Sequence, residues 1–572
     1  MSNRQPDNDI AARVAEGWRL QRLGHHAQAE TIYRAVLQQQ PENAIAWHNL
    51  GLIAVQAGAT DAAIDLFRQA VTHEPDNPRF LTNLAQTLRG AGQLEAAISV
   101  ASKAIAQSGD FANAFQCRAL AHQGLARHAE AVADFERAIA LGLVHPEVHS
   151  QHGQSLAALN RHNEALAAFD AAVQRRPDFA DALNYRSIAL FQLCRYDDAL
   201  ADCTAAIRLR DDVPSYWNNR GNVLVVIGRF DDALLDFDRA ITLKPDYPDP
   251  YVNKGIALLQ LGNFEHGWFY FEWRWKREAA KDQRKFKQPL WLGKTEIRGK
   301  TIFLHSEQGF GDTIQFFRYA ALVRQMGAKV LLGVQQPLKS LIQHALPDIA
   351  VYAEGEVIPP FDLQCPLMSL PLACATRTLD DIPPSPKLAA PEPIRQAWAD
   401  RLGPKSRLRV GLVWQGNPGH LNDHNRSMPL EALAPLIALD ADFTCLQKSI
   451  SAEDGQTLQD WGVASFAEDL TDFTATAGLI EALDLVISVD TSLAHLAGAM
   501  GKEVWLLQPK NPDFRWLLCR DDSPWYPSLR MFRQAEQGGW EAVVAEVKQT
   551  LTMRGEKAVY FSRGSYNTPC YR

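Results

Sequence analysis

The sequence lacks three features that would each narrow its class: paired cysteines, a long apolar run and an excess of positive charge. Its eight cysteines are scattered over 572 residues without a Cys-x-x-Cys pair, which argues against a disulfide framework or a zinc site. No run approaches the roughly 18 apolar residues of a membrane-spanning helix, and the first residues lack the apolar core of a signal peptide. A net charge of -8 argues against binding nucleic acid by phosphate neutralisation. We therefore expect a cytoplasmic protein with no membrane span and no nucleic-acid partner.

The first half of the sequence repeats with a period of 34 residues. A small residue recurs at this spacing, and a bulkier, mostly aromatic residue follows it sixteen positions later. The small series is Gly17, Gly51, Ala85, Ala119, Gly153, Ser187, Gly221 and Gly255, and the second series is Tyr33, Phe67, Ala101, Phe135, Phe169, Cys203, Phe237 and Phe271. This pattern resembles the tetratricopeptide repeat, a helix pair with small residues where the helices cross. The resemblance implies an all-α superhelix of about eight repeats over residues 10–281, after an N-terminal tail of residues 1–9.

One position on the first helices of these repeats is rich in asparagine, with Asn49, Asn83, Asn219 and Asn253 in four of the repeats. An asparagine amide both donates and accepts hydrogen bonds, so a ladder of them on the concave face can hold the backbone of an extended peptide. The series is interrupted by Cys117 and Tyr185. The alternative interpretation is that asparagine is simply common at this repeat position.

Asp236-Phe-Asp238 has the form of the Asp-x-Asp pair with which some sugar transferases hold a divalent metal. It lies on a repeat helix with the repeat's aromatic residue between the two carboxylates, so we interpret it as exposed helix surface. No cluster of histidine, cysteine and carboxylate residues has metal-ligand spacing. The sequence therefore predicts no metal site.

The segment from Trp268 to Arg277 is unusually aromatic and is followed by a basic junction, residues 282–298. A terminal repeat must cover its exposed apolar face, so we expect this segment to cap the repeat array against the next domain. Stacking on carbohydrate is the alternative role.

From residue 299 the pattern changes to alternating strands and helices, and the first of these helices is expected to be an amphipathic one over Thr313–Met326. The expected strands are Thr301–His305, Lys329–Val334, Ile349–Tyr352 and Phe361–Cys365 within residues 299–395, then Leu408–Trp414, Phe443–Gln447 and Asp484–Val489 within residues 396–552. Residues 380–395 are rich in proline and are expected to form a hinge, and residues 553–572 are a tail. Two Rossmann-like halves joined by a hinge predict a ligand-binding cleft between lobes.

Three polar turns follow predicted strands and should line that cleft. In the first, Gly309 and Gly311 allow a sharp turn, and Asp312 is either a helix cap or a general base facing the cleft. The turn does not match the glycine spacing of a dinucleotide fingerprint, which disfavours a nicotinamide enzyme. In the second, Arg426 either neutralises a phosphate or is solvated. In the third, residues 490–493 precede a short helix whose N-terminus could hold an anionic group such as a diphosphate.

The motifs Gly-Phe-Gly-Asp, Trp-x-Gly-Asn…Asp-x-x-Arg-Ser and Asp-Thr-Ser-x-x-His-Leu-Ala together resemble the lipopolysaccharide heptosyltransferase group, over roughly residues 299–550. Repeats followed by such a region resemble the O-linked N-acetylglucosamine transferases that modify proteins. The resemblance implies a two-lobed GT-B fold with Asp312 as the base. The donor-binding residues that it implies, together with the turns above, are Gly309, Gly311, Arg426, Asp469, Asp490, Thr491, Ser492 and His495. Arg426 stands where the family usually has lysine, and Ser492 where it has glycine.

The sequence thus predicts a tetratricopeptide superhelix followed by a two-lobed α/β region. We expect a metal-independent, inverting glycosyltransferase that takes sugar from a nucleotide-diphosphate donor and needs no cofactor. The repeats would recruit a protein or glycan acceptor. The alternative, from a different class, is a non-catalytic scaffold whose transferase-like half keeps only the fold.

Overall fold

The structure is a computed structural model that describes residues 5–277, 286–419 and 422–556. Residues 1–4 and 557–572 of the two predicted tails, and residues 282–285 of the predicted junction, lie outside the described residues. The chain divides into two compact units, Met1–Val223 and Leu224–Arg572. No helix in the described ranges combines the length and the apolar character needed to cross a membrane.

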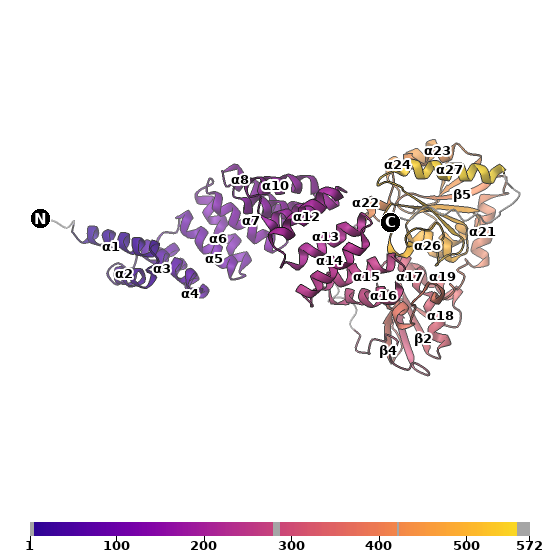
Figure 1. The fold of residues 1–572 in the computed structure, drawn as a ribbon, viewed down its shortest axis with the longest axis horizontal. Coiled ribbons are helices and arrows are strands. Elements are labelled where there is room, and N and C mark those ends of the chain that lie inside the picture. The colour runs from indigo at the N-terminus through magenta and orange to yellow at the C-terminus, as the bar shows by residue number, and fades with distance from the viewer. Residues whose placement is uncertain (1–4, 278–285, 420–421, 557–572) are drawn as a thin grey trace. The chain divides into compact units, whose positions relative to one another are not determined.

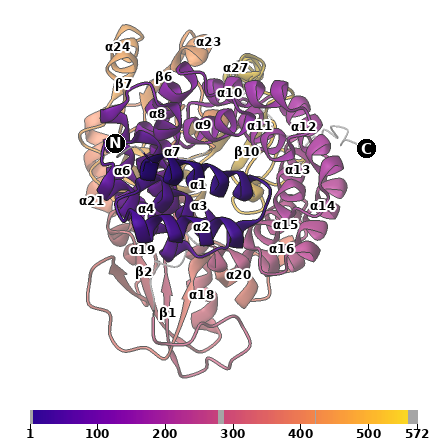
Figure 2. The ribbon, with the colours of Figure 1, turned by 90° about the vertical axis from the view of Figure 1, so that its left-hand side faces the viewer.

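The first unit consists of packed helix pairs that wind into a superhelix (Figures 1 and 2). Its helices are α1 (Gln5–Arg22), α2 (His26–Gln39), α3 (Ala44–Gln56), α4 (Thr60–His73), α5 (Pro78–Gly90), α6 (Leu94–Gln107), α7 (Ala112–Gly124), α8 (His128–Ala140), α9 (Pro146–Ala158), α10 (His162–Arg175), α11 (Ala180–Gln192) and α12 (Tyr196–Leu209). Helix α13 (Pro214–Val226) contains the division between the units. The helical repeat array predicted from the 34-residue period is confirmed.

The two helices of a repeat cross where the small residue meets the ring that follows it. A Cβ atom built on Gly51 would lie 2.6 Å from the Phe67 ring, and Gly153 stands in the same relation to Phe169. Where the second residue is Cys203, the first is Ser187, and the thiol donates a hydrogen bond to the Ser187 hydroxyl over 3.0 Å. We call these fitted pairs: Gly17, Gly51 and Gly153 leave room for the ring sixteen positions later, and Ser187 meets the smaller Cys203.

The turns between the two helices of each repeat share a left-handed residue that also recurs every 34 positions. In the first unit glycine occupies it three times, and Ala126, Asn160 and Cys194 adopt a φ of 57–59° at the later positions. The glycines are Gly24, Gly58 and Gly92. A positive φ is disfavoured for a residue with a Cβ atom, so the packing of the flanking helices imposes this turn even where the residue disfavours it.

The second unit begins with the last repeat helices, α14 (Phe230–Leu243), α15 (Pro248–Gln260) and α16 (Phe264–Phe271), followed by the 3-10 helix η1 (Glu272–Lys276). The Trp268 side chain of α16 is 1% exposed and packs edge-on against Phe316 and Phe514 of the α/β region, with ring centroids 5.9 and 5.8 Å away. The Gln260 amide donates to the Pro512 carbonyl over 2.8 Å. The aromatic segment thus caps the last repeat against the α/β region, as the sequence indicates, and the compact units divide at 223/224 instead of near residue 281.

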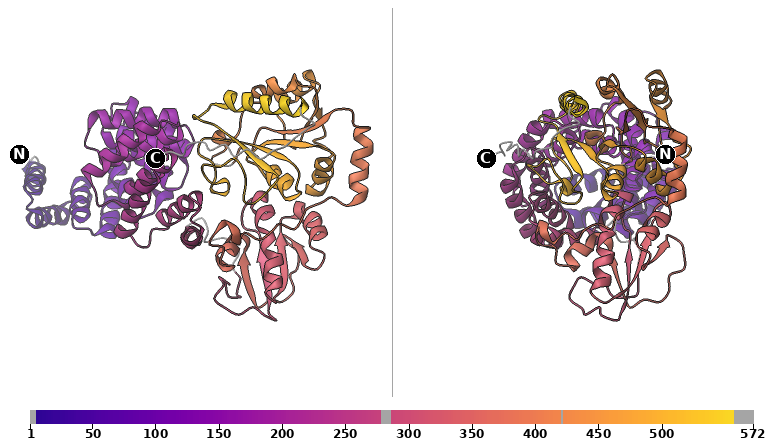
Figure 3. Two further views of the ribbon diagram at one scale, coloured as in Figure 1. Left: turned by 45° about the vertical axis from the view of Figure 1, so that its right-hand side comes forward. Right: turned by 90° about the vertical axis from the view of Figure 1, so that its right-hand side faces the viewer.

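The α/β region contains two parallel sheets (Figure 3). The first has the order β3-β2-β1-β4, and the second has the order β10-β9-β8-β5-β6-β7. The strands are β1 (Thr301–His305), β2 (Lys329–Val334), β3 (Ala350–Ala353), β4 (Leu363–Pro366), β5 (Leu408–Val413), β6 (Ala441–Cys445), β7 (Ala464–Ser465), β8 (Leu485–Val489), β9 (Val504–Gln508) and β10 (Leu529–Arg533). The direction of strand succession reverses between β5 and β8, which are neighbours in the second sheet. In open parallel sheets this switch point opens a crevice at the carboxyl ends of the strands.

Helices connect these strands, and the first connection differs from the sequence prediction. A helix was expected from Thr313 to Met326, but α17 (Phe310–Phe316) begins three residues earlier and α18 (Arg318–Gln325) follows it. The earlier start places Asp312 in the first turn of α17. The other helices are η3 (Gln336–Leu338), α19 (Lys339–Ala345), η4 (Leu367–Ser369), α20 (Leu370–Ala373), η5 (Leu379–Asp381), α21 (Glu392–Leu402), α22 (Asp423–Arg426), η6 (Leu430–Leu433), α23 (Ala434–Ile437), α24 (Ala452–Asp460), α25 (Phe473–Glu481), α26 (Ser492–Ala499), η7 (Phe514–Trp516) and α27 (Trp540–Glu556).

The fitted pairs can be tested with two glycine-to-alanine changes. Gly51→Ala should lower the free energy of unfolding by about 1–3 kcal/mol, because its new methyl group overlaps the Phe67 ring. Gly90→Ala is the matched control, since its new methyl group meets nothing within 4 Å. It should stabilise the protein by about 0.4–1 kcal/mol through the unfolded state. Thermal denaturation followed by circular dichroism measures both, and equal effects would contradict the packing argument.

Candidate functional site

A cavity of about 920 Å³ lies in the second unit, at the carboxyl ends of both sheets. Segments that follow strands of both sheets contribute to its wall. They supply Gln308–Asp312 after β1, Gln415–Pro418 after β5, Gln447–Ser449 after β6, Asp490–Leu493 after β8, and Asp513–Arg515 after β9. The cavity therefore includes the switch point between β5 and β8, where the topology predicts a ligand.

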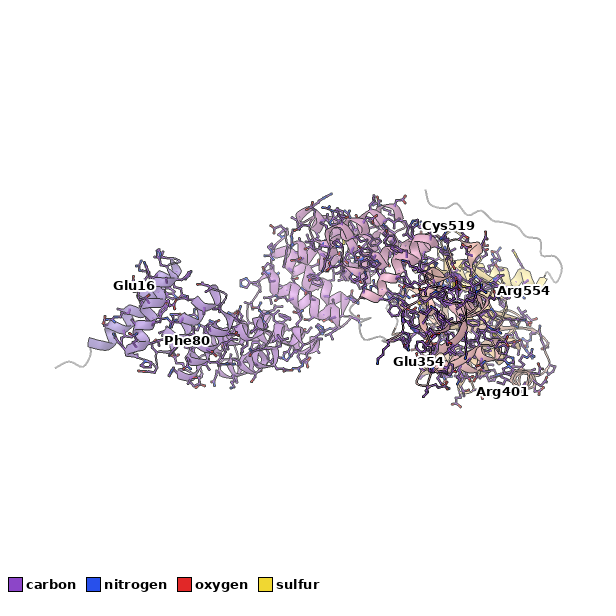
Figure 4. The ribbon with its side chains drawn as sticks, turned by 90° about the horizontal axis from the view of Figure 1, so that it is seen from below. Glu16, Phe80, Glu354, Arg401, Cys519 and Arg554 are labelled. Carbon is purple, nitrogen blue, oxygen red and sulfur yellow. The ribbon has the colours of Figure 1, made fainter. Side chains whose placement is uncertain are left out.

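Most residues predicted for the donor site line this cavity. They are Gly309, Gly311, Asp312, Arg426, Asp490, Thr491, Ser492 and His495. Asp469 is not among the lining residues, because its carboxylate pairs with Arg401 over 2.8 Å, with both side chains more than 40% exposed; Arg401 is labelled in Figure 4. Asp469 therefore lies outside the cavity wall, and its part in donor binding stays a prediction. Asp472 lines the cavity instead and caps α25 by accepting hydrogen bonds from Thr474 and Ala475.

Both oxygens of Asp312 are engaged. Oδ2 accepts the backbone N–H of Gly309 over 2.9 Å, so Asp312 does cap a helix, but from the third position of α17 and not from the N-cap position that the sequence suggests. Oδ1 forms an ion pair with Nη2 of Arg515, whose Nη1 lies 2.6 Å from Oδ1 of Asp513. Burial alone would lower the pKa of Arg515, but the carboxylates of Asp312, Asp513 and Asp490 raise it, so this guanidinium stays charged. Asp312 thus caps α17 and also faces the cavity.

The glycine at 311 serves helix packing and not the sharp turn predicted for it. Gly309 has a φ of −69°, and Gly311 is not among the glycines with a positive φ. A Cβ atom on Gly311 would lie 2.9 Å from Cδ2 of His495 in α26. The missing side chain allows α17 to approach α26 closely, which brings Asp312 towards the loop after β8.

His495 is buried and neutral. Its ring stacks on Trp516 at 5.0 Å between centroids, and Nδ1 lies 3.0 Å from the Tyr526 hydroxyl. Burial, followed by the positive charge of Arg515, lowers the pKa of His495 well below its usual range. At neutral pH this side chain therefore offers hydrogen bonds without a positive charge.

Asp490 and Thr491 shape the N-terminus of α26. Thr491 is the N-cap and accepts the Leu493 N–H over 3.3 Å, and Ser492 and Leu493, which carry the first amides of this helix, line the cavity. Burial raises the pKa of the Asp490 carboxyl to about 6, and the negative charge of Asp513 adds to this effect. The helix dipole and these amides favour an anionic guest.

Two cations besides Arg515 line the cavity on this side. Arg426 ends α22, and its Nε lies 3.1 Å from Oδ1 of Asp423. Lys448 follows β6 and donates to the Thr471 carbonyl over 3.4 Å; it makes no ion pair with another residue in the described ranges. Sequence reasoning missed Lys448 and Arg515, although the rule that ligands bind beyond strand ends points to both.

The last repeat contributes to the same wall through Val252, Ile256, Phe271, Arg274 and Arg277. Arg274 is buried and its guanidinium contacts Glu307, in the loop after β1, over 3.0 Å. Although burial favours the neutral form, the carboxylates of Glu307 and Glu272 raise the pKa of Arg274. This ion pair fixes the last repeat to the loop that carries Asp312.

Some residues of the asparagine series form hydrogen bonds between neighbouring repeats. The Asn83 amide contacts His48 over 2.7 Å, and the Asn219 amide donates to Asn184 over 2.9 Å. Asn49 is only 6% exposed, and Asn253 accepts a hydrogen bond from Arg277. These contacts favour a structural role for the series, and each amide keeps further hydrogen-bonding capacity. Binding of a peptide backbone at these positions stays a prediction.

The interpretation of Asp236 as exposed surface is wrong. Asp236 is 4% exposed, whereas Asp238 is exposed and pairs with Lys254. The two carboxylates lie in different environments because residues two positions apart on a helix do not share a face. Among the described residues, no group of three or more histidine, cysteine or acidic side chains is placed to hold a metal ion.

Comparison with known proteins identifies the repeats. Family models described as tetratricopeptide repeat match residues 14–78, 150–214 and 54–121, and one described as TPR repeat matches residues 221–262. The N-terminal part of the chain thus consists of tetratricopeptide repeats, a class of helical repeat that suggests binding of protein or peptide.

Individual relatives are similar over part of the chain. Protein FlbA of Caulobacter vibrioides is 27% identical over 315 residues, which cover 50% of this chain and 52% of that protein. The chain therefore matches about half the length of this curated relative. Among solved structures, YrrB, titled a TPR protein with an unusual peptide-binding site, is 22% identical over 32% of this chain and 95% of its own, with a TM-score of 0.30. A tetratricopeptide repeat protein from Parabacteroides merdae is 17% identical over 44% of this chain and 99% of its own, with a TM-score of 0.34.

The raised pKa of Asp490 predicts a pH-dependent gain in stability for Asp490→Asn. The carboxyl titrates near 6 in the folded protein and near 3.8 when exposed, so folding disfavours its ionised form. That cost is absent below about pH 4, grows between pH 4 and 6, and is constant above pH 6. The free energy of unfolding of the variant should therefore exceed that of wild type by an amount that rises between pH 4 and 6, to on the order of 2–3 kcal/mol.

Thermal denaturation at several pH values measures this gain. Asp522→Asn is the matched control, because the hydrogen bond from Arg520 lowers the pKa of Asp522. Its stability relative to wild type should fall as the pH rises, and a pH-independent difference for Asp490→Asn would contradict the burial argument.

Proposed function

We propose that the protein is a metal-independent, inverting glycosyltransferase that uses a nucleotide-diphosphate sugar. One observation carries the proposal: a single cavity gathers Asp312 from the loop after β1 and Arg426 with residues 490–493 from the region of the second sheet. The two parallel sheets then correspond to the two Rossmann-like lobes of a GT-B architecture. The strand order of the second sheet, with its reversal between β5 and β8, supports this assignment.

In the proposed reaction, the Asp312 carboxylate accepts the proton of an acceptor hydroxyl. The oxygen attacks the anomeric carbon from the face opposite the diphosphate, and the bond to the diphosphate breaks with its electron pair on the leaving group. Arg426 and the first amides of α26 stabilise that charge, in place of a metal. Orientation of the two substrates within the cavity supplies much of the barrier reduction, so a weak carboxylate base suffices.

The repeats would recruit the acceptor, a protein or peptide. Two observations support this part: the tetratricopeptide class itself, and the side chains of α15 and η1 in the cavity wall. An acceptor held by the last repeat would therefore lie beside the loop that carries Asp312.

Asp312→Asn should lower sugar transfer by at least about 100-fold, since an amide cannot accept the proton. Donor binding should not weaken. The matched control is Asp381→Asn, which removes a carboxylate that also caps backbone amides but lies outside the cavity. Transfer of radiolabelled sugar to protein acceptors measures both. If Asp312→Asn retains activity within a few-fold, the residue is only a cap.

Activity should persist in an excess of chelator, because cationic side chains and helix amides take the place of a metal. Transfer is measured before and after dialysis against EDTA, then again with added magnesium or manganese. Loss of transfer that either metal restores would contradict the metal-free mechanism.

A second candidate function is a non-catalytic scaffold that binds proteins through its repeats. The observation that favours it is the engagement of both Asp312 oxygens, one by Gly309 and one by Arg515. A scaffold would capture partner proteins yet bind no nucleoside diphosphate, so titration of the full-length chain with UDP, GDP, ADP and CDP separates the two functions.

A further inference from the structure

We propose that Arg515 receives the diphosphate of the donor and holds Asp312 in an ion pair until a diphosphate arrives. This inference rests on the proposed function, because it assumes a phosphorylated donor in the cavity. It assigns a binding role to a residue that the sequence motifs do not include, and it links donor binding to the availability of the base.

The position of Arg515 carries the argument. Its side chain is 12% exposed, lines the cavity, and lies between Asp312 on one side and Asp513 on the other. A third carboxylate, Asp490, interacts with it electrostatically. Arg515 therefore stands at the meeting point of the loop after β1 and the loop after β8, which the proposed reaction assigns to base and leaving group.

The two carboxylates hold Arg515 in unequal ways. Asp513 accepts both the backbone N–H of Arg515 and its Nη1, over 3.0 and 2.6 Å, within one turn of η7. Asp312 contacts only Nη2 and comes from a residue 203 positions away in the chain. The contact with Asp513 can thus anchor the arginine while the Nη2 edge changes its partner.

A diphosphate is the partner that suits this edge. A guanidinium offers planar, paired N–H donors that match phosphate oxygens, and a diphosphate brings more negative charge than one carboxylate. Asp312 keeps the Gly309 N–H as a second partner after Arg515 moves. When Arg515 exchanges Asp312 for the diphosphate, its buried guanidinium therefore stays paired with an anion, and Oδ1 of Asp312 is released.

The released oxygen is the one that would accept the acceptor's proton. While Nη2 of Arg515 contacts that oxygen, an acceptor hydroxyl cannot donate its proton to it. Exchange of partners at Arg515 thus makes the base available only when the donor is in place.

The first arm of the test measures affinity for inorganic pyrophosphate and for UDP, GDP, ADP and CDP by isothermal titration calorimetry on the full-length protein. Arg515→Ala should weaken binding of pyrophosphate and of the preferred diphosphate by about 10- to 100-fold, the scale of a lost charged hydrogen bond. Arg515→Lys should recover part of this loss, since it keeps the charge without the paired donors. Arg520→Ala is the matched control, because Arg520 pairs with Asp522 outside the cavity.

The second arm removes the competitor and predicts the opposite sign. Asp312→Asn should tighten pyrophosphate binding several-fold, because Arg515 no longer has to leave a carboxylate. The gain should vanish in the Arg515→Ala background, as a double-mutant cycle requires for coupled groups. Asp522→Asn, which removes the partner of Arg520, should change nothing. If Arg515→Ala does not fold, the response to Asp312→Asn decides the question alone.

The outcomes separate this inference from the proposed function. If Arg515→Ala and Asp312→Asn bind pyrophosphate as wild type does, while Arg426→Ala weakens binding, Arg515 is not the diphosphate residue and the transferase proposal survives. If the wild-type protein binds neither pyrophosphate nor any of the four diphosphates, both proposals are wrong.

Discussion

The second unit depends on the packing of one indole ring, that of Trp268, into the core of the α/β region. The ring is 1% exposed and meets Phe316 and Phe514 edge-on. Burial of a side chain of this size contributes on the order of 2–3 kcal/mol through the hydrophobic effect, and edge-on aromatic pairs add to it. Because Trp268 comes from the last repeat, this packing makes a repeat helix part of the cavity wall and explains why the compact units divide inside α13.

A second constraint is the charge of the cavity. Its arginines are held by carboxylates: Arg426 by Asp423, Arg515 by Asp312 and Asp513, and Arg274 by Glu307. A buried charge without a partner is unfavourable, so pairing stabilises the site when no anion is present. Because of this pairing, an anionic ligand must displace a carboxylate from an arginine. Its affinity therefore depends on how much more strongly it interacts with that arginine than the carboxylate did.

The sequence predicts the regular elements of this fold well, because local patterns specify them. The strands Thr301–His305 and Lys329–Val334 have the predicted bounds, since buried parallel strands are short apolar runs that end at polar turns. The 34-residue period likewise predicts the helix pairs. The start of α17 was placed three residues late, because the cap uses a backbone amide of Gly309 and the sequence gives that residue no capping side chain.

The candidate site is only partly predictable, because its contacts join distant segments. Strand ends indicate Asp312, Arg426 and residues 490–493, but the pairing of Asp312 with Arg515 across 203 positions has no local signal. Asp469 and Asp472 differ by three positions on one loop, and only the structure shows that Arg401 draws the first away from the cavity. Burial of Asp236 is likewise not predictable from the local sequence, since it depends on neighbouring helices.

The fitted pairs at the helix crossings have a consequence for how such an array can change over evolutionary time. Gly51 accommodates Phe67, whereas Ser187 accommodates Cys203, so each small residue suits its own partner sixteen positions later. Both members of a pair lie inside one repeat. Recombination that exchanges or duplicates whole repeats therefore preserves every crossing, while exchange of a single helix separates partners of mismatched volume. The repeat, and not the helix, is the unit by which this array can lengthen or diversify.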